Sequence, residues 1–409
     1  MCVWGARFAK QSVQVSAIIH RLPGWRNGRR SGFKIRRVKP CEFESHSGDH
    51  HRKVQSTIGR WAFFVACDKV REKRGVFKVS ATTSYSRTAS VQNSTRKALL
   101  TYRYPQYDAG VANLGDFIQS LAARQFYPKV DCLMDRDAMA QVSDPCKAII
   151  NGWYQLDDEY HYSRSIQPKA LSIHICNPKD FNKQFKTLER WSEFGPIGCR
   201  DEKTAEFLRA HGFDAYFSGC LTTTLGRSFS GKQRVNTGGV KVVLADLNPD
   251  LVCKEDISGL NLFQKVRHSI INRVANRKLL SIINDLISAD AEVQTTQHLA
   301  SLGLSDEEYF KQARGLLEIY EQADLVLTSR IHCALPCLGM GTPVVLFVND
   351  EWDLRFPGLI DWLNTVRYTR KGNIRMSIQT ENGAVVNPKK HVEYAARMAD
   401  ECERFFAKD

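Results

Sequence analysis

The strongest constraint on the fold of this 409-residue chain is the pattern between residues 323 and 347. A short apolar run, a polar break, an apolar stretch of about three helical turns, a glycine and a second apolar run follow one another. Strands that are apolar along their whole length are typical of a parallel sheet covered by helices on both faces. The segment therefore predicts a strand, a helix and a second, parallel strand.

The polar break holds Ser329, Arg330 and His332, where the first of these strands leads into the helix. In open parallel sheets ligands bind at this edge, and the N–H groups of a helix N-terminus attract anions. A guanidinium, a hydroxyl and an imidazole grouped there indicate an anionic substrate and a proton transfer. The alternative is that Arg330 and His332 are structural, with the imidazole bonded to a strand carbonyl.

Polar residues stand at the ends of other predicted strands. Asn113, Gly115 and Asp116 open a helix after a loop, where they either cap the helix or bind a ligand. Asn151 and His174 each end a strand, on the same side as that loop if the sheet is parallel. For His174 the alternative is a hydrogen-bonded histidine of the core.

Two further positions belong to the same pattern. Arg200 and Asp201 lie between a short strand and a helix, so Arg200 either pairs with a nearby carboxylate or binds a ligand. His298 follows a strand predicted at 292–296. Alternation of strands and helices along the chain predicts an α/β protein.

Several of these segments together resemble the polysaccharide pyruvyl transferase family. The similarity covers roughly residues 97–350. It is carried by N-L-G-D at 113–116, N-G-W at 151–153, G-P-I-G-C-R-D at 195–201, G-C-L-T at 219–222, S-R-x-H at 329–332 and G-x-P-V at 341–344. The resemblance implies two Rossmann-like doubly wound domains facing each other across a cleft, as in GT-B folds. We expect these domains at 97–230 and 238–409, with a terminal helix in the second.

The resemblance also implies an activity, the transfer of the pyruvyl group of phosphoenolpyruvate to two sugar hydroxyls as a cyclic ketal with release of phosphate. Arg200 and Arg330 are then the clamps for the donor's phosphate and carboxylate, because guanidinium groups bind such anions in a forked geometry. His332 is the expected general acid, and Ser329 helps to hold the anion.

The remaining candidates have less defined roles. Asp116, Asp201 or His298 activates the sugar hydroxyl, and the sequence does not choose among them. The expected substrate-binding set is completed by Asn113, Gly115, Asn151 and His174. No cofactor and no metal is expected, and the predicted partners are phosphoenolpyruvate and a sugar or lipid-linked glycan. The alternatives are a glycosyltransferase using a nucleotide sugar on the same scaffold and a catalytically silent carbohydrate-binding relative.

The net charge of +14 raises the question of nucleic-acid binding. Residues 1–96 hold 20 of the 58 Lys and Arg residues and only 5 of the 44 Asp and Glu residues, so the rest of the chain is close to neutral. A basic surface is therefore not expected in the body of the protein, and we predict no nucleic-acid partner.

The basic segment 1–96 shows no sustained helical or strand period. Residues 31–36 can be written in codons that form a leucine anticodon hairpin, so we predict translation through a leucine tRNA gene upstream of the true start. The alternatives are a disordered basic arm and a nucleic-acid tether. We expect deletion of this segment to leave activity intact.

The twelve cysteines form no C-x-x-C pair, which is typical of reduced thiols in a cytoplasmic protein. No apolar run approaches the roughly 20 residues that span a bilayer, and we find no signal peptide. The chain is therefore predicted to be cytoplasmic and without a transmembrane segment.

Overall fold

The computed structural model describes residues 95–102, 111–154, 162–175, 185–229, 239–247, 262–350, 356–369 and 371–407. All of these residues belong to one compact unit. The extension predicted at 1–96 lies outside them except for its last two positions, and so does most of the predicted interdomain linker.

The first sheet has six parallel strands in the order β3-β1-β4-β5-β6-β7. Its strands are β1 (Arg96–Thr101), β3 (Cys132–Asp135), β4 (Cys146–Tyr154), β5 (Ile166–Ile175), β6 (Ile197–Cys199) and β7 (Ala215–Phe217). Its helical elements are α2 (Leu114–Arg124), η1 (Arg136–Gln141), α3 (Phe185–Ser192), α4 (Glu202–Ala210), η3 (Leu221–Thr224) and α5 (Gly226–Phe229). His174 lies at the end of β5, as predicted, but β4 continues to Tyr154, so the expectation that Asn151 ends its strand is wrong.

The second sheet also has six strands, in the order β14-β13-β12-β11-β8-β9, and only β14 is antiparallel to its neighbour. The strands are β8 (Lys241–Ala245), β9 (Glu292–Thr296), β11 (Leu325–Thr328), β12 (Val344–Asn349), β13 (Asn364–Tyr368) and β14 (Ile374–Ser377). The helices are α6 (Leu262–Leu286), α7 (Asp306–Glu321), α8 (Ile331–Met340) and α9 (Val392–Ala407), with the single turn η4 (Ile360–Trp362). The strand–helix–strand unit predicted from 323–347 is confirmed as β11, α8 and β12.

Alternate residues of the second sheet enter different clusters, which is the expected consequence of the strand period of two. Val242 and Leu244 of β8 pack with Leu279 of α6, whereas Val243 belongs to the cluster that includes α7, α8 and the first sheet. The second sheet is therefore covered on both faces, as its uniformly apolar strands predict.

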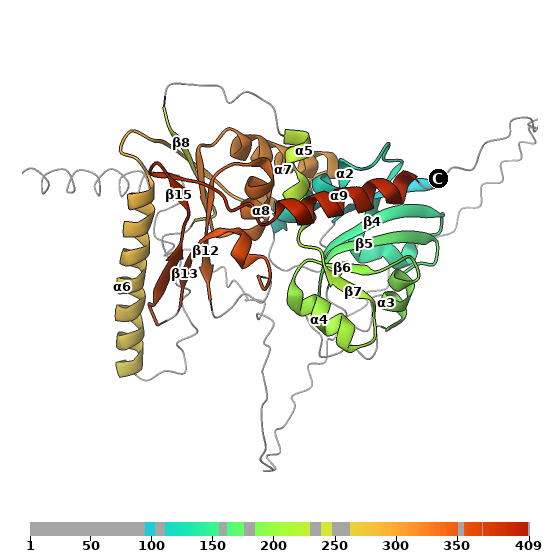
Figure 1. Ribbon diagram of the computed structural model, residues 1–409, viewed down its shortest axis with the longest axis horizontal. Coiled ribbons are helices and arrows are strands. Elements are labelled where there is room, and N and C mark those ends of the chain that lie inside the picture. The colour runs from blue at the N-terminus through green and yellow to red at the C-terminus, as the bar shows by residue number, and fades with distance from the viewer. Residues whose placement is uncertain are drawn as a thin grey trace, which may run out of the picture. The chain divides into compact units, whose positions relative to one another are not determined.

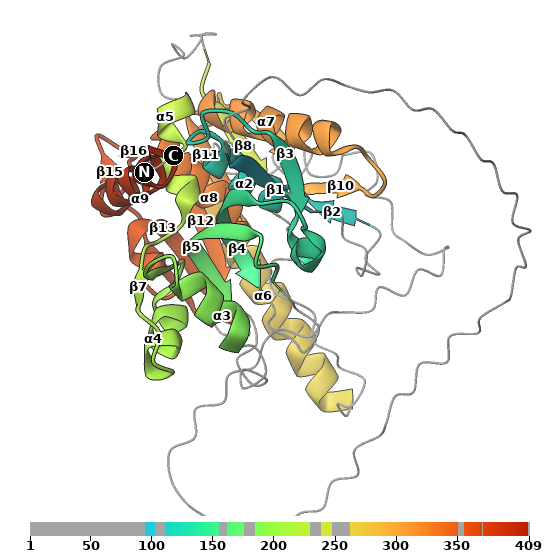
Figure 2. The same cartoon turned by 90° about the vertical axis from the view of Figure 1, so that its right-hand side faces the viewer.

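Two contacts join residues 96–229, which carry the first sheet, to residues 241–407, which carry the second. The short strands β2 (Val111–Asn113) and β10 (Leu299–Ser301) pair antiparallel, as Figure 2 shows beside α7. The terminal helix α9 packs against β5 and η3 of the first sheet (Figure 1), which confirms that it returns to one of the two sheets. A further hairpin joins β15 (Thr380–Glu381) and β16 (Ala384–Val385).

The α/β class is thus confirmed, with two mainly parallel sheets. The division into GT-B-like domains at 97–230 and 238–409 stays a prediction. None of the helices in the described part of the chain combines the length and the apolar character that a bilayer-crossing helix requires.

A contact without room for side chains joins α8 to η3. A Cβ atom on Gly339 would lie 2.4 Å from the main-chain oxygen of Thr223, and one on Gly226 would lie 2.3 Å from that of Gly339. Backbone atoms cannot move aside as a flexible side chain can. These glycines therefore allow the helix that follows Arg330 to approach the end of the first sheet closely.

We expect Gly339→Ala to lower the free energy of unfolding by about 1–3 kcal/mol, the usual cost of overpacking. Gly315→Ala in α7 is the matched control, because a Cβ there meets nothing within 4 Å. Relief of the helical glycine penalty should raise its stability by about 0.5–1 kcal/mol. Thermal unfolding checks both, and equal midpoints for the two variants would contradict the close approach.

Candidate functional site

The predicted site residues lie at the carboxyl ends of the parallel strands. In each sheet the strand order reverses beside the first strand, between β1 and β4 in the first sheet and between β8 and β11 in the second. Ligands of open α/β sheets bind at such switch points. Asn151 lies in β4 near the first switch point, and Arg330 follows β11 at the second.

The two sheets bring Arg200 and His332 together. Arg200 follows β6, and its Nη1 lies 3.4 Å from Nε2 of His332 in α8. Both side chains are buried, with exposed fractions of 1% and 8%. Because a guanidinium can only donate, Nε2 is the acceptor, and a neutral imidazole in this contact carries its proton on Nδ1.

Arg200 is a buried cation without a carboxylate partner among the described residues. Its Nε atom has no hydrogen-bond partner there, and the one side-chain hydrogen bond that it makes with the described residues is that to His332. Burial of an unpaired charge is costly unless another group compensates it. The alternative that Arg200 pairs with a nearby carboxylate is not met among the described residues, because the carboxylate of Asp201 is bonded to His174 and Thr204, and the arrangement suits an anionic ligand.

The sequence of α8 accounts for the position of His332. Pro336 has no N–H to bond the carbonyl four residues earlier, which is that of His332, and its ring crowds the same turn. His332 accordingly departs from helical geometry, with φ −82° and ψ 15°. Its ring lies against Gly115 at the start of α2, where a Cβ would come within 3.3 Å of Nδ1.

Asp246, a residue that the sequence analysis missed, organises the switch point of the second sheet. Its Oδ2 accepts hydrogen bonds from the main-chain N (3.0 Å) and Nδ1 (2.9 Å) of His298 and from Nε of Arg330 (3.1 Å). Burial would raise the pKa of Asp246, but the His298 hydrogen bond and the Arg330 charge hold it below its usual range. Its position directly after an apolar strand was the signal that could have identified it.

The backbone at Asp246 is also unusual. Its φ of 50° places it in the left-handed region, which costs most residues about 1–2 kcal/mol and Asp somewhat less. Its carbonyl accepts a hydrogen bond from the hydroxyl of Ser329 at 2.8 Å. Ser329, predicted to hold an anion, thus fixes the strand end instead.

His174 and Asp201 form a buried pair next to Arg200. The Nδ1 of His174 donates to Oδ2 of Asp201 at 2.6 Å, and Asp201 also caps α4 through the main-chain N of Thr204. The main-chain N of Arg200 donates to the carbonyl of Ile173, so His174 and Arg200 lie on neighbouring strands. His174 is therefore bonded, as the core interpretation requires, but its partner is an ionisable carboxylate at the candidate site.

The start of α2 carries the other predicted residues. Asn113 caps the helix by accepting from the main-chain N of Gly115 at 3.1 Å, so the capping interpretation is confirmed. Asp116 accepts from Nε2 of Gln119 at 3.1 Å, and Asn151 donates to the main-chain oxygen of Gln119 at 3.0 Å.

Two side-chain oxygens near this helix start lack donors. Oε1 of Gln119 and Oδ1 of Asn151 have no hydrogen-bond partner, and each side chain is 1% exposed. Gly152, with φ of 109°, leaves the space beside Gln119 clear of a side chain. Buried acceptors without donors are uncommon, and these two lie at the switch point of the first sheet.

A second buried arginine differs from Arg200 in being fully paired. Arg136 donates to both carboxylate oxygens of Asp137 and lies over the rings of Tyr102 and Trp153. Burial alone would lower its pKa, but Asp116 and Asp137 raise it well above its usual value. Its interactions indicate a structural role at the same edge of the sheet.

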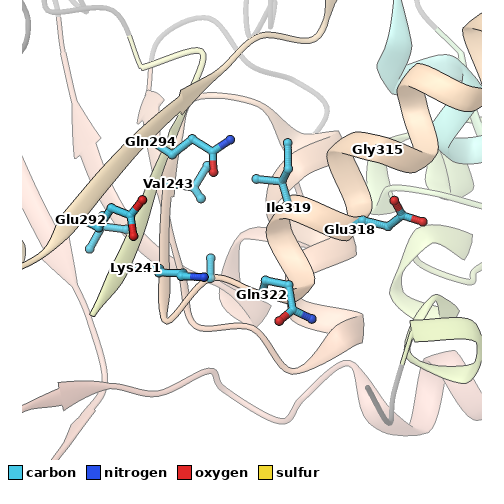
Figure 3. A pocket seen from close by; sticks show the side chains of 10 residues that line it. Lys241, Val243, Glu292, Gln294, Gly315, Glu318, Ile319 and Gln322 are labelled. Carbon is cyan, nitrogen blue, oxygen red and sulfur yellow. The ribbon is translucent and has the colours of Figure 1, made fainter. Parts of the chain in front are cut away.

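A cavity of about 310 Å³ lies elsewhere in the second sheet (Figure 3). It is lined by the first residues of β8 and β9, Lys241 and Glu292, and by Ile319 and Gln322 at the end of α7. Because these are the amino ends of the strands, the cavity lies at the sheet edge opposite to Arg330. No predicted site residue lines it.

The site residues fall into two groups. Arg200, His332 and Gly115 are in contact, with the His174–Asp201 pair on the strand beside Arg200, while His298, Ser329 and Arg330 surround Asp246. The main-chain N of Leu114 donates to the carbonyl of His298 at 2.7 Å, which ties the start of α2 to the second group. Arg200 follows a strand of the first sheet, whereas Arg330 and His332 follow a strand of the second.

Taken together, these features define an α/β protein with a cationic site at the carboxyl ends of its strands. The family model for polysaccharide pyruvyl transferases matches residues 113–351, which is more than half of the chain. The chain therefore belongs to the polysaccharide pyruvyl transferase family. No curated protein matches it.

The two buried arginines generate opposite expectations for stability. Arg200→Met should raise the thermal midpoint of the ligand-free protein, because it removes an uncompensated buried charge while filling similar space. Arg136→Met should lower the free energy of unfolding by about 1–3 kcal/mol, because it breaks charged hydrogen bonds. Thermal unfolding of both variants checks this, and a lowered midpoint for Arg200→Met would show that the charge is compensated.

Proposed function

We propose that the protein transfers the pyruvyl group of phosphoenolpyruvate to two hydroxyls of a sugar, in a polysaccharide or glycan precursor, as a ketal. Membership in the polysaccharide pyruvyl transferase family supports the reaction class. The observation that carries the choice of donor is Arg200, a buried guanidinium without a carboxylate partner among the described residues, in contact with an imidazole. Phosphoenolpyruvate supplies the missing negative charge twice, as phosphate and as carboxylate.

The donor-binding roles follow from charge and geometry. Arg200 and Arg330 bind the phosphate and the carboxylate, since each guanidinium offers donors in a fork that matches these anions. The terminal nitrogens of Arg330 make no hydrogen bond with the described residues, because its bond to Asp246 uses Nε. His332, held between Arg200 and Gly115, delivers a proton to the methylene carbon from its protonated form, in which Nε2 carries the proton once the donor's anion has taken up the N–H groups of Arg200.

The proposed chemistry balances without a redox step. Protonation of the methylene carbon makes the neighbouring carbon electrophilic, and the first sugar oxygen bonds to it. The bond from this carbon to the phosphate oxygen then breaks, and the second sugar oxygen takes its place. Of the two hydroxyl protons, one replaces the proton that His332 gave to the methyl group and the other leaves with phosphate.

We assign His174 as the group that removes a hydroxyl proton. Asp201 accepts its Nδ1–H at 2.6 Å, which makes Nε2 the basic nitrogen of the neutral ring. The three earlier candidates are less suitable. The carboxylate of Asp201 is occupied by His174 and Thr204, and Asp116 accepts from Gln119. Both ring nitrogens of His298 are engaged, Nδ1 by Asp246 and Nε2 by the hydroxyl of Tyr320. His174 is next to Arg200 on the neighbouring strand, so acid and base both adjoin the donor site.

The acceptor sugar needs partners for its hydroxyl groups. Oε1 of Gln119 and Oδ1 of Asn151 can each accept from a hydroxyl, and both lie near the switch point between β1 and β4. A ketal joins two hydroxyls of one sugar, and a pair of acceptor oxygens suits such a diol. We therefore place the acceptor beside the start of α2.

The reaction is tested by phosphate release from phosphoenolpyruvate with a panel of p-nitrophenyl glycosides and oligosaccharides. His332→Ala should lower the rate by about 10²–10⁴-fold, the usual loss for a general acid. His211→Ala, at an exposed histidine that ends α4, is the control and should keep the full rate. Equal rates for wild type and His332→Ala would defeat the mechanism.

The acceptor subsite is tested with the most active glycoside of that panel. Gln119→Met should raise the KM for the sugar more than the KM for phosphoenolpyruvate, because only the sugar loses an acceptor oxygen. Gln125→Met, at the other end of the same helix, is the matched control. A change confined to the KM for phosphoenolpyruvate would place Gln119 on the donor side instead.

A further inference from the structure

Asp246 stands at the centre of the switch point in the second sheet. One oxygen of its carboxylate receives three N–H donors, two from His298 and one from Arg330. These partners come from different segments, after β9 and after β11. A side chain that joins the ends of three strands is well placed to set the geometry of the residues that follow them.

Which nitrogen of Arg330 contacts Asp246 decides what the rest of the guanidinium can bind. Asp246 bonds Nε, not the terminal nitrogens, and neither Nη1 nor Nη2 of Arg330 has a hydrogen-bond partner among the described residues. The Arg330 side chain is 42% exposed, whereas that of Asp246 is 11% exposed. The carboxylate thus fixes the base of the guanidinium and leaves its terminal nitrogens without a bond to the described residues.

The backbone supports the same interpretation independently. Asp246 is one of the few non-glycine residues with positive φ in the described chain, at 50°. This conformation lets its carbonyl accept from the hydroxyl of Ser329, the residue directly before Arg330. Left-handed backbone at a functional edge is typically kept for geometry. The main chain of Asp246 therefore holds Ser329, and its side chain holds Arg330, the next residue.

We propose that Asp246 is the positioning residue that presents the fork of Arg330 to an anionic group of the donor. This inference rests on the proposed function, because it takes phosphoenolpyruvate as the ligand. Asp246 does not touch the donor and acts only through Arg330, with His298 holding the carboxylate from the other side.

Electrostatics and positioning predict opposite signs for one substitution. Asp246→Asn removes a negative charge beside the anion site, so charge alone predicts tighter binding of phosphoenolpyruvate. Positioning predicts weaker binding, because a neutral amide oxygen holds three donors less strongly and the fork loses its orientation. The sign of the change therefore separates the two explanations.

The experiment is a double-mutant cycle on the full chain, with phosphoenolpyruvate titrated calorimetrically into wild type, Asp246→Asn, Arg330→Ala and the double variant. Asp246→Asn should weaken binding about tenfold, equivalent to 1.4 kcal/mol. In the Arg330→Ala background the same substitution should change binding less than about twofold. With substrate turnover, Asp246→Asn should raise the KM for phosphoenolpyruvate more than it lowers kcat.

Asp350→Asn is the matched control. Asp350 follows β12, the strand next to β11, and accepts from Nε of Arg367, so it is a second carboxylate of the same kind at the same edge. It should leave phosphoenolpyruvate binding within about twofold of wild type. Thermal unfolding of each variant shows that the folded protein is being titrated.

The outcomes separate the inference from the proposed function. If wild type does not bind phosphoenolpyruvate, the proposed function fails. If wild type binds and Arg330→Ala weakens binding, but Asp246→Asn tightens it or leaves it unchanged, only the role of Asp246 is overturned. An equal loss from Asp246→Asn in both backgrounds, or from Asp350→Asn, also overturns it, because the effect would not then pass through Arg330.

Discussion

The site depends on the contact between the start of α2 and the segment after β9, where the main-chain N–H of Leu114 donates to the carbonyl of His298. Around it β2 pairs with β10, so the first turn of α2 is fixed against the end of β9. A second close contact, between Gly339 of α8 and Thr223 of η3, holds α8 against the end of the first sheet. The Leu114–His298 hydrogen bond uses backbone atoms alone, and the glycine contact leaves no room for side chains. Both contacts therefore hold the two sheets close enough for His332 to reach Arg200. Backbone contacts tolerate little displacement, which is what a short-range ionic site requires.

The two arginines of the site are held in different ways, and the difference has a physical reason. Arg200 is buried without a carboxylate partner among the described residues, which costs stability but leaves its full charge for a ligand. Arg330 is nearly half exposed and bonded to Asp246, which lowers its net attraction for an anion but fixes its direction. The donor proposed above carries a phosphate and a carboxylate on one carbon and needs both properties, because attraction alone does not set the orientation of its double bond. Arg136 shows the contrasting case of a buried arginine whose charge is satisfied within the protein.

Local sequence was sufficient for much of this architecture. Uniformly apolar runs predicted β11 and β12, and the strand predicted at 292–296 is β9. Residues at strand ends were correctly placed at one edge, because parallel strands bring their carboxyl ends together. Even the departure of His332 from helical geometry follows from Pro336 four residues later. All of these inferences use interactions that span only a few residues.

The rest depends on partners that are distant in the chain. Asp246 lies 52 residues from His298 and 84 from Arg330. Its position after an apolar strand could mark it as a candidate, but no local pattern identifies these two partners. The pairing of β2 with β10 joins two segments too short for a period of two to be recognised. Likewise, the sequence allowed Arg200 to pair with Asp201, yet Asp201 is committed to His174 and to the cap of α4. Which carboxylate neutralises which cation is decided by packing across the sheet. That Arg200 meets no carboxylate among the described residues, the feature on which the proposed anionic ligand rests, therefore becomes visible only in the folded protein.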